Sequence, residues 1–403
     1  MKRSFVHLAI AAVAAFGLLM GIGPALAAPS KALIELRRHL LDADINTLTF
    51  HSIDAMFDVI RVPTAGQPTR LEEHPAKLDF SYQFEGQTIA AEDFLERTYT
   101  NALLVIKNDR IVFERYLNNT TPQTHFLSMS MAKSVTSLLI GMAISDGAIT
   151  SVNDPIVKYV PELVGTGYDG VTIRQALMMR SGVDWNERYD FGKESPMQRL
   201  HNAAVVENRI RFTEPALHAT RAHAPGEVFN YSTLETGVLG LVLEHAVKRS
   251  LPEYMADRWW KRAGMQSEGF WLADGPPGIG KAVNGMGFNA VLRDYGRIGL
   301  MMLHRGKANS IQLVPENWVS ESTRPERSEP AIPGQARGYQ YQWWTFTGSD
   351  AYSAIGLQGQ FLYVDPKTQT VVVKLSYFPP GERRADAETE AFLRRISQWT
   401  PDR

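Results

Sequence analysis

The chain has 403 residues, of which 44% are hydrophobic, 21% are charged and 10% are aromatic. At about 100–200 residues per domain, this length indicates one large or two closely joined domains, which excludes disordered and fibrous proteins. The 42 basic and 43 acidic residues nearly cancel without a basic block, which argues against nucleic acid and anionic membrane surfaces as partners. The absence of cysteine excludes disulfides, thiolate metal sites and cysteine nucleophiles.

The first 27 residues have the order of parts found in a secretory signal peptide. Lys2 and Arg3 give a cationic start, an uncharged run extends over residues 8–20, and small residues precede position 28. The run is shorter than the ~20 residues that span a bilayer. We therefore expect cleavage after Ala27 and a periplasmic or secreted mature protein without a membrane association, with an uncleaved inner-membrane anchor as the alternative.

In the mature chain, strand patterns lie near both ends and helical patterns lie between them. Two apolar runs with strand character flank the turn Asn108-Asp109, which predicts a hairpin. Apolar stretches that end at glycine, such as the one before Gly147, predict helices. In chain order, the predicted elements are a helix over residues 31–43, strands over 102–106 and 111–116, helices over 130–145, 172–180 and 234–245, strands over 338–346, 360–364 and 371–378, and a helix over 386–399.

Strands from both termini with helices between them predict an α/β fold. We expect an antiparallel sheet built from the two termini and flanked by helices, with a mostly helical region inserted. On this division, residues 28–125 and 285–403 form the two parts of the sheet region, and residues 126–284 form the helical region. A cleft at the seam between the regions is the natural place for a site.

Ser130 and Lys133 begin a predicted helix and form a candidate catalytic pair. A spacing of three places both side chains on one helix face. A serine hydroxyl is a weak nucleophile until a base accepts its proton, and a lysine amine that has lost its hydration can be that base. Backbone N–H groups at the start of the helix, including that of Ser130, can hold an oxyanion.

The alternative for this pair is a helix-capping serine followed by a surface lysine. Two facts favour the catalytic interpretation. Ser130 is the only serine in the chain with a lysine three residues later, and Lys133 is the only charged residue between Arg115 and Asp146. A lone charge in such an apolar stretch needs a reason.

Two later segments add candidate groups. Tyr231, which follows a turn and precedes an apolar helix, can pass the serine proton to the leaving group if Lys133 stabilises its phenolate; otherwise it is an ordinary buried tyrosine. Gly356 and Gly359 open a strand and let backbone approach a ligand closely. The N–H of Gln360 is then a candidate second oxyanion donor, and the alternative is a plain β-bulge.

Taken in this order and with these gaps, Ser130-Met-Ala-Lys133, Tyr231-Ser232 and the glycine-rich strand resemble the serine β-lactamase and penicillin-binding-protein superfamily, and most closely its class C-like branch. Within that branch, the stretches over residues 179–189, 229–231 and 356–360 are similar to the 6-aminohexanoate-dimer hydrolases and related esterases. The likeness runs from about residue 95 to about residue 400, and residues 28–90 carry no motif that we can place.

The resemblance implies a serine hydrolase that works through an acyl-enzyme, without metal or cofactor. On this basis Ser130 is acylated, Lys133 accepts its proton, Tyr231 relays the proton to the leaving group, and the N–H groups of Ser130 and Gln360 hold the oxyanion. Tyr189 falls where amide-hydrolysing relatives keep a tyrosine that positions the leaving nitrogen. The other candidate substrate-binding residues are Trp185, Ser232, Gly359 and Trp344, and Trp343 and Phe361 are aromatic residues that either line the same pocket or belong to the core.

Two motifs depart from the pattern of β-lactamases and transpeptidases. The second keeps an asparagine in those enzymes where this chain has Thr233, and the third keeps Lys-Thr-Gly or His-x-Gly where this chain has Leu357-Gln358-Gly359. The missing cation removes a carboxylate partner worth ~1.5–3 kcal/mol. We therefore expect small neutral esters or amides as substrates and weak or no β-lactamase activity. The alternatives are a non-catalytic protein that binds peptidoglycan fragments or a protein partner, and a D-amino-acid peptidase.

Overall fold

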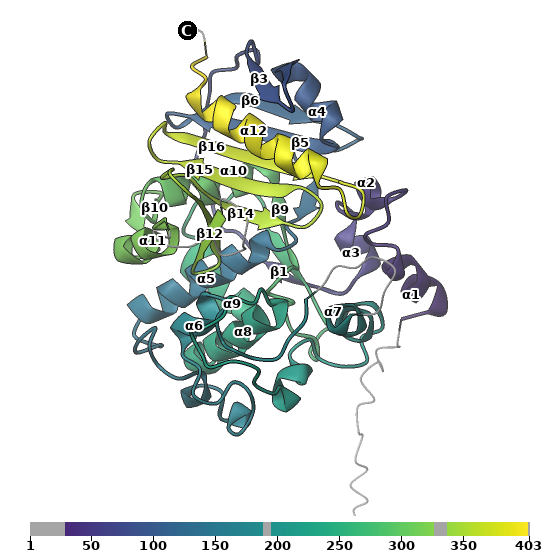
Figure 1. Ribbon diagram of the computed structural model, residues 1–403, viewed down its shortest axis with the longest axis vertical. Helices are drawn as coiled ribbons and strands as arrows, with labels where there is room; N and C mark the ends of the chain where they lie inside the picture. The colour runs from purple at the N-terminus through teal and green to yellow at the C-terminus, as the bar shows by residue number, and fades with distance from the viewer. Residues whose placement is uncertain (1–28, 188–194, 326–336, 402–403) are drawn as a thin grey trace, which may run out of the picture.

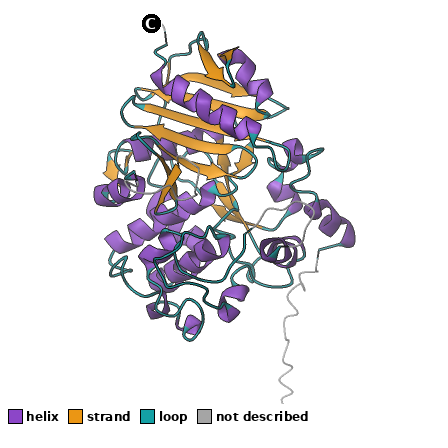
Figure 2. Ribbon diagram, in the orientation of Figure 1, coloured by secondary structure: helices purple, strands orange, loops and turns teal. Residues whose placement is uncertain are grey.

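The computed structural model describes residues 29–187, 195–325 and 337–401, and the predicted signal peptide over residues 1–27 lies outside them. None of the helices in these ranges has the length and apolar character that crossing a membrane requires. The described chain forms an upper part rich in strands and a lower part made mainly of helices and loops, as Figure 2 shows.

An eight-stranded sheet dominates the upper part, and both ends of the chain contribute to it (Figure 1). Neighbouring strands are antiparallel except β2 and β6, which are parallel. In spatial order the strands are β12 (Arg337–Gln340), β13 (Trp343–Phe346), β14 (Tyr352–Gly356), β15 (Gln360–Asp365), β16 (Thr370–Ser376), β5 (Thr100–Lys107), β6 (Arg110–Tyr116) and β2 (Glu72–Glu73). This arrangement confirms the predicted α/β fold.

Side-chain alternation divides the core between the two faces of this sheet. In β16, Val371 and Val373 belong to the cluster that includes helix α10 (Leu292–Leu303), whereas Val372 belongs to the cluster that includes α12 (Arg384–Gln398). This period of two is the one that a strand buried on both faces requires. On the α12 face, Phe94 stacks on Phe392 with ring centroids 3.7 Å apart.

Three predicted elements differ from the structure, and the first is the helix predicted over residues 31–43, which ends at Arg38. The stretch 338–346, predicted as one strand, is the hairpin β12–β13, because Tyr341 and Gln342 form a turn with φ of 40° and 69°. The helix that Thr172 opens ends at Leu177 rather than at residue 180, and Met179 adopts a positive φ of 57° that a helix cannot accommodate. The predicted hairpin around Asn108-Asp109 is confirmed.

The lower part is built around two apolar helices, α5 (Met131–Ser145) and α8 (Thr233–Val247), which pack against each other. A second sheet of four strands, in the order β1, β8, β9 and β7, lies next to them. Its strands are β1 (Val59–Val62), β7 (His125–Leu127), β8 (Gly269–Leu272) and β9 (Phe288–Val291). This sheet joins strands from three segments of the chain. The predicted division at residues 126 and 285 stays a prediction.

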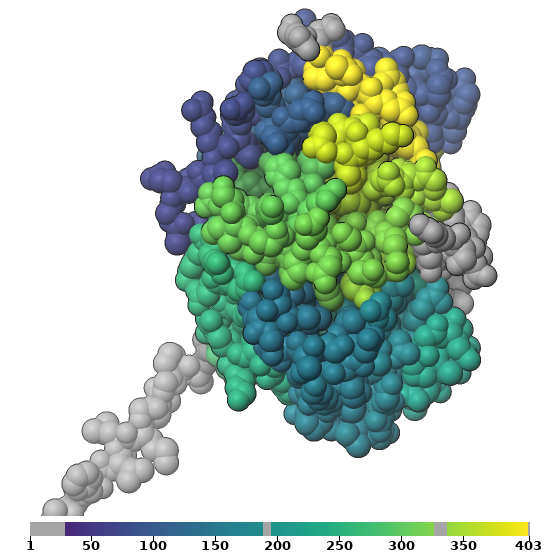
Figure 3. All heavy atoms as spheres, turned by 90° about the vertical axis from the view of Figure 1, so that its left-hand side faces the viewer, coloured from purple at the N-terminus to yellow at the C-terminus, as the bar shows by residue number. Residues whose placement is uncertain are grey.

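Shorter elements complete the described chain. The side of the molecule that carries α11 (Glu316–Thr323) and the small hairpin of β10 (Lys307–Ala308) and β11 (Ile311–Gln312) faces the viewer in Figure 3. The remaining elements are α1 (Lys31–Arg38), α2 (Asn46–Thr49), α3 (Ile53–Met56), β3 (Ser81–Phe84), β4 (Gln87–Ala90), α4 (Phe94–Arg97), α6 (Ile173–Leu177), α7 (Pro196–Leu200), α9 (Leu251–Met255), β10 (Lys307–Ala308), β11 (Ile311–Gln312) and α11 (Glu316–Thr323), with short 3₁₀ and π turns between them.

Candidate active site

Ser130 stands at the point where the short strand β7 turns into helix α5. The turn needs an unusual backbone, because Met129 adopts a positive φ of 47°. Ser130 occupies the N-cap position of α5, yet its side chain makes no capping hydrogen bond. The structure thus does not show the capping serine of the alternative interpretation, and the hydroxyl is left to interact with other side chains.

The Lys133 side chain is buried one helical turn further on, with only 1% of its surface exposed, so the alternative of a surface lysine is wrong. Its Nζ lies 2.9 Å from Ser130 Oγ, 2.8 Å from Thr233 Oγ1 and 2.9 Å from the carbonyl oxygen of Gly285. Burial lowers the pKa of Lys133 from 10.5 to about 8, against the charge of Glu187, which acts in the opposite direction. About a tenth of the amine is therefore neutral at pH 7, and the neutral fraction rises with pH.

The hydrogen bonds around Lys133 also set the direction of its lone pair. The Glu187 carboxylate accepts hydrogen bonds from both the N–H and the hydroxyl of Thr233, so the oxygen of Thr233 is free to accept from Lys133. The carbonyl of Gly285 can only accept. A neutral amine has two N–H groups, and these two acceptors use both. Its lone pair then faces the hydroxyl proton of Ser130.

Tyr231 completes the group that the sequence predicted. Its ring lies with its centroid 4.8 Å from Lys133 Nζ and stacks on Trp344, with centroids 5.8 Å apart. Burial raises the pKa of Tyr231 above its ordinary value, and the charge of Glu187 adds to this, whereas a hydrogen bond with Ser130 opposes it. Tyr231 is consequently a neutral phenol next to Ser130, in the form that can donate a proton.

An open cleft with an empty volume of about 700 Å³ exposes Ser130 and Tyr231. Its wall is mostly apolar, and four charged residues are among those that line it. The lining residues are Ser130, Tyr231, Arg337, Trp344, Ile355, Gly356, Leu357, Gln358, Gly359, Phe378, Glu382, Arg383 and Asp386. The cleft therefore brings the first, second and third predicted motifs to one surface.

The third motif approaches Ser130 through backbone. Gly356 packs so closely on the carbonyl of Ser128 that a Cβ atom would not fit there. Gln358 and Gly359 then form a turn with φ of 58° and 91° before strand β15 begins. The Gln360 amide is fully used inside the protein, since its Nε2 donates to the carbonyl of Ser376 at 2.9 Å. Only the backbone of Gln360 can therefore serve the cleft, and its role as an oxyanion donor stays a prediction.

The other predicted binding residues are placed differently from one another. Trp344 and Gly359 line the cleft. Trp185 is half-buried and donates through Nε1 to Glu187 at 3.2 Å, and it is not among the lining residues. Ser232 is fully buried and caps helix α8 by accepting from the N–H of Glu235, so its hydroxyl is not presented to the cleft. Tyr189 lies outside the described residues, and Trp343 and Phe361 are fully buried core residues.

Sequence reasoning gave no role to Glu187 and treated Thr233 only as a departure from the family pattern. The sequence contains one indication of a role for Thr233, which is that it occupies the third place of the second motif. Glu187 lies 46 residues before Thr233, and nothing local in the sequence connects them.

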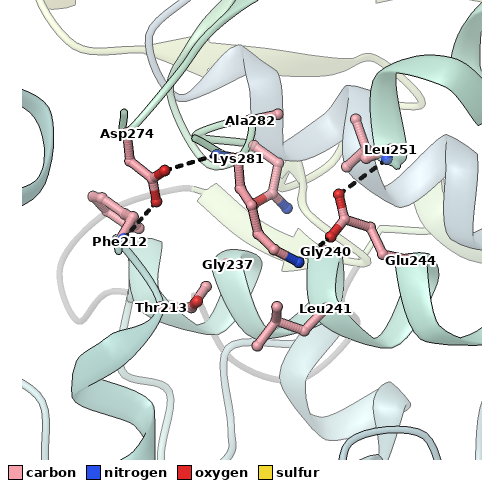
Figure 4. Close-up of a pocket in the computed structure, with 11 residues that line it drawn as sticks. Phe212, Thr213, Gly237, Gly240, Leu241, Glu244, Leu251, Asp274, Lys281 and Ala282 are labelled. Atoms are coloured by element: carbon pink, nitrogen blue, oxygen red, sulfur yellow. Dashed lines mark hydrogen bonds and ion pairs between the residues drawn. The ribbon is translucent and has the colours of Figure 1, made fainter. Parts of the chain in front are cut away.

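A second, smaller pocket lies between α8 and the segment that precedes β9 (Figure 4). Its charged groups are satisfied within the protein. Lys281 pairs with Glu244 at 2.6 Å, and Asp274 accepts from the backbone N–H groups of Phe212 and Lys281 at 2.7 and 2.8 Å. The polar groups that line this pocket therefore hold segments of the protein together.

The fold and the side chains assembled in the cleft define a serine hydrolase related to the β-lactamases. The family model described as Beta-lactamase matches residues 90–395, and the chain belongs to this family.

Two relatives illustrate the range of this family. A 6-aminohexanoate-dimer hydrolase of Paenarthrobacter ureafaciens is 31% identical over 308 residues, which make up 73% of this chain and 76% of the relative. Protein flp of Staphylococcus aureus is 27% identical over 181 residues, which make up 42% of this chain and 34% of flp.

Solved structures show the same fold. A Bacillus anthracis protein assigned as a 6-aminohexanoate-dimer hydrolase superposes with a TM-score of 0.81 at 23% identity, over 92% of this chain and 98% of its own. EstCE1, a hydrolase with promiscuous acyltransferase activity, superposes with a TM-score of 0.60 at 16% identity, over 75% of this chain and 95% of its own. At these identities the likeness establishes the fold alone.

Proposed function

We propose that this protein is an exported serine hydrolase that cleaves small ester or amide bonds through a covalent acyl-serine intermediate. One observation carries the proposal. The buried amine of Lys133 has acceptors for both of its N–H groups, and its remaining direction points to Ser130 Oγ at 2.9 Å. This is the arrangement that a neutral lysine needs in order to remove a serine proton.

In the proposed reaction, Ser130 Oγ attacks the carbonyl carbon of the substrate while its proton moves to Lys133 Nζ. The negative charge that forms on the carbonyl oxygen is held by the backbone N–H groups of Ser130 and Gln360. When the bond to the leaving group breaks, Tyr231 gives its proton to that group and recovers one from Lys133. Water then attacks the acyl carbon and gives up a proton to the pair formed by Lys133 and Tyr231. The bond between that carbon and Ser130 Oγ breaks to release the acid, and the pair passes the proton to Oγ.

The third motif of the cleft favours neutral substrates, although the cation Arg383 also lines the cleft. This motif, Leu357-Gln358-Gly359, carries no cation, and the lining residue Arg337 is engaged by Asp386 at 3.1 Å and by Glu390. Arg337 is therefore not available to a substrate carboxylate. The name of the Paenarthrobacter relative supports amides as one substrate class. The order of charged, apolar and small residues over positions 1–27 supports export with cleavage after Ala27, and the mature protein should then begin at Ala28.

A fluorophosphonate probe and p-nitrophenyl acetate test the proposal. The wild type should be labelled at Ser130 and should hydrolyse the ester with a burst or steady turnover, and Ser130→Ala should lose both. Ser137→Ala is a matched control, because Ser137 lies on the same helix, is fully buried and has no hydrogen-bond partner for its hydroxyl among the described residues. A wild type that binds the ester slowly without releasing product would instead support a non-catalytic binding protein.

A further inference from the structure

The segment over residues 31–58, called the N-terminal arm here, precedes the part of the chain that the family model matches, which begins at residue 90. It carries the short helices α1, α2 and α3, which lie along one side of the molecule, above α7 and up to the edge of the large sheet (Figure 1). The arm thus spans the helical part and the sheet part of the protein.

One end of the arm is fixed to the helical part by Arg37, of which only 2% is exposed. Its guanidinium donates to the carbonyl of Met56 at 2.6 Å, within the arm, and to Asn208 Oδ1 at 2.9 Å. It also donates to the carbonyl of Val206 at 3.3 Å. A buried guanidinium with several acceptors holds the arm in one place relative to the helical part.

The middle of the arm is fixed to the sheet by Asn46, which is fully buried. Its amide Nδ2 donates to the carbonyls of Tyr377 and Phe378 at 3.1 and 2.9 Å, directly after strand β16. The backbone N–H of Phe378 in turn donates to the carbonyl of Gln358 at 3.1 Å. Asn46 therefore fixes residues 377 and 378, and Phe378 in turn is hydrogen-bonded to Gln358.

The arm also contacts the Gln358 side chain directly. Gln358 Nε2 donates to the carbonyl of Leu41 at 2.9 Å, and 6% of the residue is exposed. Both Gln358 and the following Gly359 have a positive φ, and the ring of Phe378 packs against Gly359. A left-handed backbone is unfavourable for a residue other than glycine, so contacts from outside the turn must hold Gln358 in it.

The arm reaches the Ser130 side of the cleft as well. The carbonyl of Phe50 accepts from the N–H of Leu127 at 2.8 Å, three residues before Ser130. Apolar packing extends this contact, because Phe50 and Met129 belong to one buried cluster, against which Leu357 also packs. The two backbone segments of the proposed oxyanion hole therefore rest on the same piece of chain.

We propose that the N-terminal arm is a positioning element of the oxyanion hole, and that Gln358 and Asn46 are the positioning residues through which it acts. By holding the Gln358-Gly359 turn, the arm keeps the N–H of Gln360 directed at the same point as the N–H of Ser130. This inference rests on the proposed function. It gives a role in catalysis to a segment that carries no motif.

Gln358→Met tests the inference, because methionine keeps the length of the side chain and removes the donor to Leu41. An oxyanion hole acts on the transition state, so kcat for p-nitrophenyl acetate should fall by about 10- to 100-fold with KM unchanged within about twofold. The rate of inactivation by a fluorophosphonate should fall by the same factor, because the tetrahedral adduct uses the same donors. A purely structural contact would not change these two rates in parallel.

Gln358→Asn guards against a variant that fails to fold, since asparagine tolerates a positive φ but is too short to reach Leu41; we expect the same loss of kcat. Asn46→Ala should lower kcat through the same turn, and the double variant Asn46→Ala/Gln358→Met should lose less than the product of the two single losses. Gln312→Met is the matched control with unchanged kcat, because Gln312 Nε2 likewise donates to carbonyls, those of Arg305 and Val314 at 2.8 and 2.6 Å, in a hairpin outside the cleft.

The outcomes separate the inference from the function on which it rests. If the wild type hydrolyses the ester and both Gln358 variants keep wild-type kcat, or change only KM, the role of the arm is wrong and the serine hydrolase remains. If the wild type is neither labelled nor active, the proposed function itself is overturned.

Discussion

The dependence of activity on pH tests the general base that the structure assigns. Burial lowers the pKa of Lys133 to about 8, so the neutral fraction of the amine rises from about 10% at pH 7 to about 90% at pH 9. We expect kcat/KM for a neutral p-nitrophenyl ester to rise about tenfold over this interval. Because burial raises the pKa of Tyr231 above its ordinary value of 10.0, the rate should then stay level to about pH 10.

The variant Glu187→Gln tests whether the rise in rate with pH comes from the titration of Lys133. The Glu187 carboxylate favours the ammonium form of Lys133, so removing its charge lowers the pKa of the lysine further and moves the rise in rate to lower pH. Glutamine keeps an oxygen that can accept from Thr233, which preserves the orientation of that hydroxyl. Initial rates measured from about pH 6 to about pH 10 give the midpoint for both proteins.

Glu235→Gln is the control, because burial raises the pKa of Glu235 to about 8 as well, in spite of its hydrogen bond with Ser181. The midpoint should be the same in this variant as in the wild type. A midpoint that stays in place or moves to higher pH in Glu187→Gln refutes the assignment to Lys133. If the rise in rate disappears in Glu235→Gln, the titrating group is Glu235 and not Lys133.

Three further outcomes follow from the same geometry. Tyr231→Phe should lower kcat by ~10²–10⁴-fold if Tyr231 transfers the proton, and near wild-type kcat would remove that role. Lys133→Met should abolish turnover and yet raise the free energy of unfolding by up to about 3 kcal/mol at pH 7. In the wild type, folding disfavours the ammonium of Lys133 below about pH 8, and this penalty disappears above the unfolded pKa of 10.5. The gain in the free energy of unfolding, measured by urea denaturation, should therefore shrink towards pH 10. An equal gain at both pH values contradicts the lowered pKa. A chromogenic cephalosporin should be hydrolysed with a kcat/KM at least about tenfold below that of p-nitrophenyl acetate, because the carboxylate partner is absent from the third motif; comparable values would contradict the neutral-substrate cleft.

The parts of the site that the sequence predicts are those that short-range geometry determines. Ser130 and Lys133 are one helical turn apart, so once residues 131–145 form α5 their side chains must lie on one face. The hairpin of β5 and β6 is likewise encoded within a few residues, by alternation on either side of Asn108-Asp109. Tyr231 was a candidate from its place in the sequence, but its approach to Lys133 was predictable only with the family resemblance, because it joins residues about 100 positions apart.

The parts that the sequence does not predict depend on contacts between distant segments or on turns without the usual residues. Tyr341 and Gln342 make the turn of β12–β13 with a positive φ and without glycine, so the apolar alternation shows no break. The arm meets the cleft through Leu41 and Gln358, which are 317 residues apart. No local sequence pattern indicates such a contact, and only the folded chain reveals what residues 31–58 hold in place.

The exchange of asparagine for threonine in the second motif changes how the base is controlled. An asparagine amide presents separate donor and acceptor atoms, whereas the Thr233 hydroxyl can turn its proton in several directions. Glu187 removes that freedom by accepting the proton, and the oxygen of Thr233 then accepts from Lys133. The same carboxylate also favours the charged lysine, which works against a base. Burial is the larger of the two influences and keeps the pKa of Lys133 near 8. Glu187 can therefore orient the lone pair of Lys133 towards Ser130 while about 10% of the amine stays neutral at pH 7.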